Sequence, residues 1–280
     1  PFVWHGPTTV AEAVAVLAEV GHDGKVLAGG QSLVPVLAMR LAQPAHLVDI
    51  NRVAGLDGVT CGPDGVRVGA LARHARLERD AEARRVLPLL GQALRLVAHP
   101  TIRNRGTTVG SLVHADPSGE MTAVLALTGG SVTALSVRGE RTIAASDFFI
   151  GPLESSLEPD ELALAAYFPA PPPGAGSAFV EVARRHGDYA LCGVGAVVAP
   201  APDGGWSVLC GYLSMAETPV VVDLSGPWTA GPDATADAAR RALQPLGDIH
   251  ATAEYRRHLA GVLTLRAIRA ALDRAGAVAA

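Results

Sequence analysis

Two short glycine-rich segments carry the residues of this chain best suited to binding chemistry. The first, Ala28-Gly29-Gly30-Gln31-Ser32, follows an apolar stretch typical of a buried strand and precedes an apolar run, with Pro35 near its start, typical of a helix. Glycines between a strand and a helix let backbone N–H groups approach an anion closely. Gly106 to Ser111 is a second turn of this kind. Together the two turns favour a ligand with two phosphates, such as a dinucleotide, although each alone also fits an ordinary tight turn.

Two carboxylates, Asp116 and Glu120, follow the second glycine-rich segment. A carboxylate at this place can accept hydrogen bonds from the ribose or ribityl hydroxyls of a bound nucleotide. The same residues also suit the start of a helix, where they stabilise free backbone N–H groups. Spacing alone favours the helix-start interpretation. His114 lies nearby without a second histidine at helical spacing, which favours a structural histidine over a metal ligand.

Composition narrows the classes of function. The chain has 280 residues, 49% of them hydrophobic and 18% charged, which indicates a globular protein long enough for two domains. A net charge of −4 without a long run of one sign gives no support for a nucleic-acid partner. Cys61, Cys192 and Cys210 are too few and too scattered for an iron–sulfur cluster or a disulfide scaffold. With no signal-peptide pattern and no long apolar segment, we expect a cytoplasmic protein without an integral membrane segment.

Periodicity predicts two parts joined by the proline-rich linker Pro169 to Gly174. Residues 1–172 are expected to form the first domain, with subdomains of about 1–55 and 56–172, and residues 173–280 the second. In the first domain, Thr9 to Glu12 fits a helical capping box, and one helix is expected over 84–97. Three strands follow the linker, near 178–182, 193–198 and 206–213, and then two helices, near 234–243 and 252–272.

Several separated motifs occur in the order of a known family. They are Ala28 to Ser32 with Arg40-Leu41-Ala42-Gln43-Pro44 and Leu47 to Asn51; Ile102 to Thr107 with Gly110-Ser111-Leu112 and His114 to Pro117; Pro159-Asp160-Glu161-Leu162; Arg185 to Ala190; and Ala253 to Leu259 with Leu263 to Ala267. This pattern resembles the FAD-binding subunit of molybdenum hydroxylases, a family that includes the carbon monoxide dehydrogenase medium chain and the xanthine dehydrogenase flavin domain. The resemblance covers nearly the whole chain.

The resemblance implies an α+β fold. A two-part FAD-binding domain of the vanillyl-alcohol-oxidase (PCMH) type would precede a small domain with a three-stranded antiparallel sheet and helices. FAD would be bound non-covalently, because no His or Cys stands at a family position for covalent attachment. The molybdenum cofactor and [2Fe-2S] clusters would reside on a molybdenum subunit and an iron–sulfur subunit, in a dimer of heterotrimers.

The resemblance also implies roles for individual residues, none of them catalytic or metal-binding. Ala28, Gly29, Gly30, Gln31 and Ser32 would hold the pyrophosphate, and Thr107, Thr108, Gly110 and Ser111 would cover the other side of the phosphates and the ribityl chain. Asp116 and Glu120 match polar positions near the cofactor, and Leu162 and Tyr189 match residues that approach the isoalloxazine. Val109 replaces a glycine of the family's second turn. Because Val takes positive φ only at a cost, the turn either differs in shape or never needs that freedom.

Three functions therefore compete. The first is an electron-transfer subunit that passes electrons from a partner's iron–sulfur clusters through FAD to an external acceptor. The second is a stand-alone flavin-dependent reductase or oxidase of the same fold, which needs its own substrate pocket and base. The third is a binding module without cofactor, which only Val109 favours.

Overall fold

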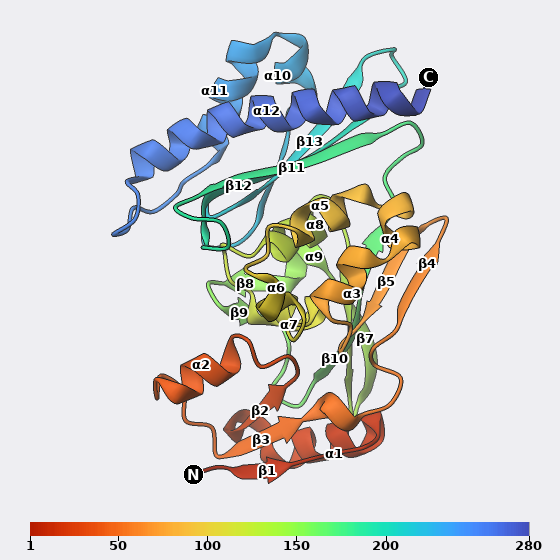
Figure 1. The fold of residues 1–280 in the computed structure, drawn as a ribbon, viewed down its shortest axis with the longest axis vertical. Coiled ribbons are helices and arrows are strands. Elements are labelled where there is room, and N and C mark those ends of the chain that lie inside the picture. Colours follow the sequence, from red (N-terminus) through yellow and green to blue (C-terminus); the bar gives the residue numbers. More distant parts are fainter. Residues whose placement is uncertain (280) are drawn as a thin grey trace.

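The computed structural model describes residues 1–279, which form three parts stacked along the long axis of the molecule (Figure 1). The N-terminal part has a parallel sheet in the order β1-β3-β2, with helix α1 packed against it. The predicted capping box is confirmed, because Glu12 N donates to Thr9 Oγ1 (3.2 Å) and Thr9 N to Glu12 Oε2 (3.3 Å). The elements are β1 (Val3–His5), α1 (Val10–Val20), β2 (Gly24–Leu27), α2 (Leu33–Ala38) and β3 (His46–Asp49), with short 3₁₀ turns at Gly21–Asp23 and Ile50–Arg52.

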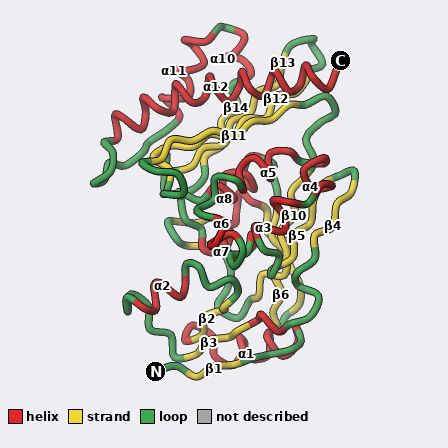
Figure 2. The backbone as a smooth tube through the Cα atoms, in the orientation of Figure 1, coloured by secondary structure: helices red, strands yellow, loops and turns green. Residues whose placement is uncertain are grey.

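The middle part is an antiparallel sheet in the order β4-β5-β10-β6-β7, flanked by short helices (Figure 2). Apolar side chains of the central strands and of these helices form the main core of the molecule. The strands are β4 (Val59–Gly62), β5 (Gly65–Gly69), β6 (Ser131–Ser136), β7 (Gly139–Ala144) and β10 (Leu162–Pro169), with a separate ribbon of β8 (Phe149–Gly151) and β9 (Glu154–Ser155). The helices are α3 (His74–Arg79), α4 (Ala81–Val86), α5 (Pro88–Leu94), α6 (Pro100–Arg103), α7 (Thr108–His114), α8 (Glu120–Leu127) and α9 (Ala145–Phe148).

The C-terminal part is an antiparallel sheet in the order β11-β12-β13-β14, with the long helix α12 lying across one face (Figure 1). Helix α8 packs against its other face, so Phe179 and Leu213 of the sheet belong to the main core. The elements are β11 (Gly176–Ala183), β12 (Ala190–Pro200), β13 (Trp206–Leu213), β14 (Val220–Asp223), α10 (Ser225–Thr229), α11 (Pro232–Ala242) and α12 (Ala253–Ala279).

The structure confirms the α+β class and differs from the sequence-based expectation in three details. One is the short helix α10, which precedes the two helices expected at the end of the chain. The second sheet has four strands instead of three, because the short run Val220–Asp223 pairs with β13 at the sheet edge. The single helix expected over 84–97 is two helices, broken at Leu87, whose backbone is not helical (φ −138°, ψ 83°). Pro88 causes this break, because it disfavours a helical residue before it and lacks the N–H that would continue the helix.

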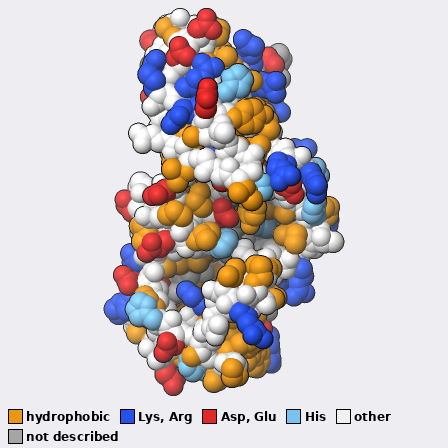
Figure 3. Space-filling model, turned by 90° about the vertical axis from the view of Figure 1, so that its left-hand side faces the viewer, with side chains coloured by type: hydrophobic (Ala, Val, Ile, Leu, Met, Phe, Trp, Pro, Cys, Tyr) orange, Lys and Arg blue, Asp and Glu red, His pale blue; other side chains and the backbone are white. Residues whose placement is uncertain are grey.

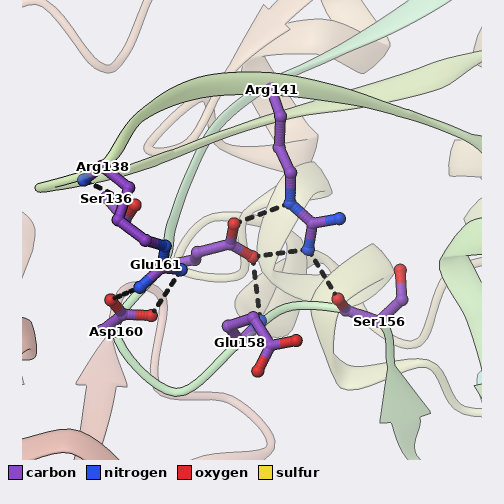
Figure 4. A network of polar contacts seen from close by, with 7 residues as sticks. All are labelled: Ser136, Arg138, Arg141, Ser156, Glu158, Asp160 and Glu161. Atoms are coloured by element: carbon purple, nitrogen blue, oxygen red, sulfur yellow. Dashed lines mark hydrogen bonds and ion pairs between the residues drawn. The ribbon is translucent and has the colours of Figure 1, made fainter.

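An ion-pair network fixes the segment that leads into β10 (Figure 4). The buried Glu161 carboxylate accepts two hydrogen bonds from Arg141, at 2.6 and 2.7 Å, and a third from Glu158 N at 2.8 Å. The Arg141 guanidinium, whose hydrogen bonds to Glu161 raise its pKa, also donates to Ser156 O (2.8 Å). Arg138 pairs with Asp160 beside it. These charge-assisted contacts fix residues 156–161, directly before Leu162.

Candidate cofactor site

The fold brings the two glycine-rich turns into direct contact. Gly29, in the turn after β2, lies so close to the second turn that a Cβ built there would be 2.6 Å from Arg105 O and 3.0 Å from Thr107 N. Gly30 has φ +73°, a conformation that L side chains rarely adopt. Both glycines are therefore required by the backbone geometry at this contact, as the sequence pattern suggested.

Two side chains from other segments brace this contact. Asn51 Nδ2 donates to Ala28 O (2.8 Å), and Arg73 Nη2 donates to Asn51 Oδ1 (2.7 Å). Arg73 Nη1 also donates to Arg105 O in the second turn. Gln31 Nε2 turns back onto its own loop and donates to Gly29 O (3.0 Å). Arg73 and Asn51 thus tie the two turns into one unit.

A hollow of about 560 Å³ opens beside the two turns. Its lining combines backbone of the first turn with two guanidinium groups, a few apolar side chains, and the Asp49 carboxylate, which accepts hydrogen bonds from Asn51: Leu27, Ala28, Gly29, Gly30, Gln31, Val34, Pro35, Asp49, Asn51, Arg73 and Arg105. Partial burial and the neighbouring Arg105 lower the pKa of Arg73. Two cations held beside a glycine-rich backbone fit a ligand with more than one negative charge. The donor set therefore fits a pyrophosphate.

The second turn ends in helix α7. Thr107 is its N-cap, and its Oγ1 accepts a hydrogen bond from Gly110 N (3.1 Å). Val109 is the second residue of this helix; it lies in the main core and is absent from the residues with positive φ. The backbone at this position is helical and does not require a glycine, so Val109 is compatible with the site. Thr108 is buried, and its hydroxyl lies 3.2 Å from His74 Nδ1.

Asp116 and Glu120 lie at the connection between α7 and α8. Asp116 Oδ1 accepts a hydrogen bond from Ser118 N (2.8 Å), and Glu120 is the first residue of α8. Burial is the main cause that raises the pKa of Glu120, to about 7. The pKa of Tyr189 is raised first by partial burial of its phenol and then by the Asp116 and Glu120 carboxylates. Tyr189 as a whole is 69% exposed. These three residues therefore form one polar group at the seam between the middle and C-terminal parts.

The loop before Tyr189 is held against the middle part of the molecule. Gly187 has φ +86°, and a Cβ there would lie 2.4 Å from the His99 ring. The rings of His99 and His186 meet edge to face with centroids 6.3 Å apart. This contact positions the loop that carries Tyr189.

Not every residue expected at the site lies on the hollow. Ala28, Gly29, Gly30 and Gln31 line it, and Ser32 follows them as the first residue before α2. Leu162 is 2% exposed and packs in the N-terminal core, so its approach to a flavin remains a prediction. Ser111 and Gly110 lie one turn into α7.

Sequence reasoning missed four polar side chains on the hollow: Asp49, Asn51, Arg73 and Arg105. Asn51 and Arg105 stand inside motifs that carry the family resemblance, so their positions could have been inferred. Arg73 lies outside those motifs, and only the fold brings it to the turns.

The fold and this cradle define a two-domain protein that binds a dinucleotide cofactor. Residues 1–171 match the FAD-binding domain of molybdopterin dehydrogenases, and residues 177–271 match the C-terminal domain of carbon monoxide dehydrogenase flavoproteins. The chain is 40% identical to caffeine dehydrogenase subunit beta of Pseudomonas sp. (strain CBB1), covering 96% of this chain and 94% of that subunit. Among solved structures, it superposes on carbon monoxide dehydrogenase from Oligotropha carboxidovorans with a TM-score of 0.92 at 32% identity, covering 98% of both chains. Quinoline 2-oxidoreductase from Pseudomonas putida 86 gives 0.87 at 33% identity, over 99% of this chain and 98% of that one.

The chain belongs to the FAD-binding medium subunits of the molybdenum hydroxylase family. It is an oxidoreductase subunit, and FAD is its cofactor. Within residues 1–279, no group of three or more His, Cys, Asp or Glu side chains is placed to hold a metal ion. No helix among the described residues is long and apolar enough to cross a bilayer.

Replacing Arg73 tests the bracing of the two turns. Arg73→Ala removes the hydrogen bonds to Asn51 and to Arg105 O together with one cation, so we expect the dissociation constant for FAD to rise about tenfold to thirtyfold. Flavin fluorescence quenching measures the constant. Arg76→Ala is the matched control, because Arg76 pairs at the surface with Asp57 and is absent from the hollow. Equal affinities of the two variants would contradict the bracing role.

Proposed function

We propose that this chain transfers electrons within a molybdenum hydroxylase complex. It would accept them from the iron–sulfur clusters of one partner, while a molybdenum subunit oxidises the substrate, and its flavin would pass them to an external acceptor. The observation that carries the proposal is the contact of Gly29 with the backbone of the second turn, beside the two guanidinium groups. The proposal takes residues 1–172 as the FAD-binding domain and 173–280 as the second domain, supported by family matches that end at 171 and begin at 177.

Each part of FAD would have its place among these residues. The turn from Ala28 to Ser32 would hold the pyrophosphate with its N–H groups, and Arg73 and Arg105 would neutralise its charge. Helix α7 would follow the ribityl chain, and Asp116, Glu120 and Tyr189 would lie toward the isoalloxazine. When bound, non-covalently in this proposal, FAD supplies redox chemistry that accepts electrons singly and releases them in pairs.

The cysteines support placing the clusters on another chain. Cys192 and Cys210 are buried in the C-terminal core, and burial raises the pKa of each thiol to about 12. Among the described residues, neither thiol belongs to a group of three or more His, Cys, Asp or Glu side chains placed to hold a metal ion. Three scattered thiols also suit the reducing cytoplasm that we propose as the location.

The side of the molecule that carries the hollow is rich in exposed apolar side chains. Helix α2 borders the hollow, has no buried residue and projects from the body at the left of Figure 1. The β8–β9 ribbon and the loops before β12 and α12 lie along the same side. Figure 3 faces this side and shows hydrophobic side chains around a hollowed middle. The large exposed apolar residues of these segments, here called the hollow rim, are Val34, Met39, Leu41, Ile150, Leu153, Tyr189, Leu246 and Ile249.

We assign the hollow rim to the iron–sulfur subunit. Exposed apolar side chains that gather on one side of a molecule favour a protein interface, and electrons must enter where the cofactor is accessible. Met39 is 61% and Leu41 73% exposed, and both lie just past α2. The same docking, repeated in two heterotrimers, would leave the remaining surface free for the dimer contact and the molybdenum subunit.

Replacing Leu41 tests this assignment. Leu41→Glu places a charge in an apolar interface, and we expect the affinity for the purified iron–sulfur subunit to fall at least tenfold, with FAD content unchanged. Gel filtration and the rate of flavin reduction in the reconstituted complex measure the effect. Val137→Glu is the control, because Val137 is similarly exposed (64%) but lies on the β6–β7 hairpin. Assembly that is unchanged in Leu41→Glu would place the partner elsewhere.

A further inference from the structure

Glu181 is a half-buried acidic residue of the C-terminal sheet with no role in the site described so far. Along β11, Ala178, Val180 and Val182 pack into the core beneath α12, whereas Phe179 belongs to the main core on the opposite face. Side chains alternate along a strand, so Glu181 points to the same side as Phe179, toward the FAD-binding domain. Its Oε2 atom is buried and has no hydrogen-bond partner.

The strand register places Glu181 over the start of α8. Phe179 pairs with Gly195, where a Cβ would meet Leu127 at the end of α8. Two residues further, Glu181 pairs with Gly193, which pairs with Leu213 at the end of β13. The next residue, Ser214, donates its N–H to Pro117 O (2.8 Å) and its hydroxyl to Ser118 Oγ (2.9 Å), just before α8 begins at Glu120.

The register therefore places the side chain of Glu181 at the part of the seam where Glu120 of the other domain begins α8. The charged or titratable groups that act on Glu120 are Asp116 from the preceding loop and Arg103 from α6, and the phenol of Tyr189 lies nearby. Arg103 already donates hydrogen bonds to Glu78 (2.9 Å) and to Val97 O (2.9 Å), so its positive charge is not paired with Glu120 alone. On Glu181 the group that acts is Glu120 itself.

We propose that the ionisation of Glu181 and that of Glu120 are coupled across the seam, so that the charge of one carboxyl opposes ionisation of the other beside the flavin end of the site. Glu181 is thus a positioning residue: it couples the packing of the C-terminal domain to the protonation of a residue in the FAD-binding domain. Ionisation of both carboxyls would force two like charges together in a poorly solvated place and loosen the seam. The coupling between Glu181 and Glu120 does not depend on bound FAD. Its effect on the cofactor rests on the proposed function.

The titration of the pair supports this inference. Burial, and then the charge of Glu120, raises the pKa of Glu181 to about 8. The pKa of Glu120 is about 7. Both folded-state values exceed the ordinary carboxyl value of 4.5. The protonated pair therefore contributes stability that is complete below that ordinary value and is lost as the pH rises through the folded values, up to about 8.

The first experiment follows the melting temperature of the full chain from pH 5 to pH 9, without FAD and again with FAD added. We expect wild type and Glu181→Gln to coincide at pH 5 and the variant to melt about 2–4 °C higher at pH 9, because a neutral amide cannot ionise. Glu217→Gln, which removes an exposed carboxyl of the same domain, should follow wild type. Parallel curves for wild type and Glu181→Gln would overturn the proposal.

The second experiment tests the coupling directly and does not depend on a change in stability. Carbon-13 NMR of the glutamate side-chain carboxyls in the full chain should show two signals that titrate above pH 6, one lost in each single variant. In Glu120→Gln the remaining signal of Glu181 should titrate at lower pH, since the neighbouring charge is gone. Independent titration of the two residues, or titration of both below pH 6, would overturn the proposal. Failure of the chain to bind FAD would refute the proposed function and leave this result intact.

Discussion

Gly29→Ala should weaken FAD binding by about tenfold to a hundredfold and leave the chain folded. The added methyl group would lie 2.6 Å from Arg105 O and 2.8 Å from Gly106 Cα, both backbone atoms that cannot move aside as a side chain can. The two turns must separate to admit it, at a cost of about 1–3 kcal/mol, as for other overpacked sites. Because both turns supply the cradle, this cost falls on the affinity for the cofactor. Equilibrium dialysis with FAD measures the constant, and circular dichroism shows whether the fold is kept.

Gly58→Ala is the matched control for this substitution. It adds the same methyl group in the same domain, at a glycine with open space around its Cβ position. We expect wild-type FAD affinity. If Gly29→Ala binds FAD as tightly as Gly58→Ala does, the turn from Ala28 to Ser32 is not the pyrophosphate cradle.

The local features of this chain were predictable from the sequence for a simple physical reason. The capping box at Thr9 and the strand–turn–helix around Gly30 each depend on residues within a few positions of one another. The helix-start interpretation of Glu120 was also correct, because Glu120 begins α8. That interpretation does not exclude a role toward the cofactor, since the same residue is partly buried at the seam.

The features that escaped prediction depend on contacts between distant segments. Arg73 reaches the second turn only because the fold brings its segment beside Arg105, and it lies outside the motifs that carry the family pattern. Strand β14 is short and lies at the edge of its sheet, where it pairs with β13 alone. Glu181 lies in the strand expected over 178–182, and only the position of α8 makes its side chain half-buried.

The second large effect concerns the reduction of the flavin. In the proposed relay, the FAD-loaded chain alone should not be reduced by the substrate of the complex, because oxidation of that substrate takes place at the molybdenum subunit. The complete complex should reduce its flavin within the time of catalytic turnover. A stand-alone reductase or oxidase of this fold would show no such dependence on partner subunits. The difference is all or none, which makes it the largest effect expected for this chain.

The most direct test of the electron-transfer role is therefore anaerobic absorbance spectroscopy of the FAD-loaded chain. It is mixed in turn with aldehydes, purines, N-heterocycles and carbon monoxide, first alone and then after reconstitution with the iron–sulfur and molybdenum subunits. The account predicts an unchanged flavin band for the chain alone with every compound, and bleaching by the substrate of the complex once both partners are present. Bleaching of the isolated chain by any of these compounds would contradict the relay and establish a stand-alone flavoenzyme.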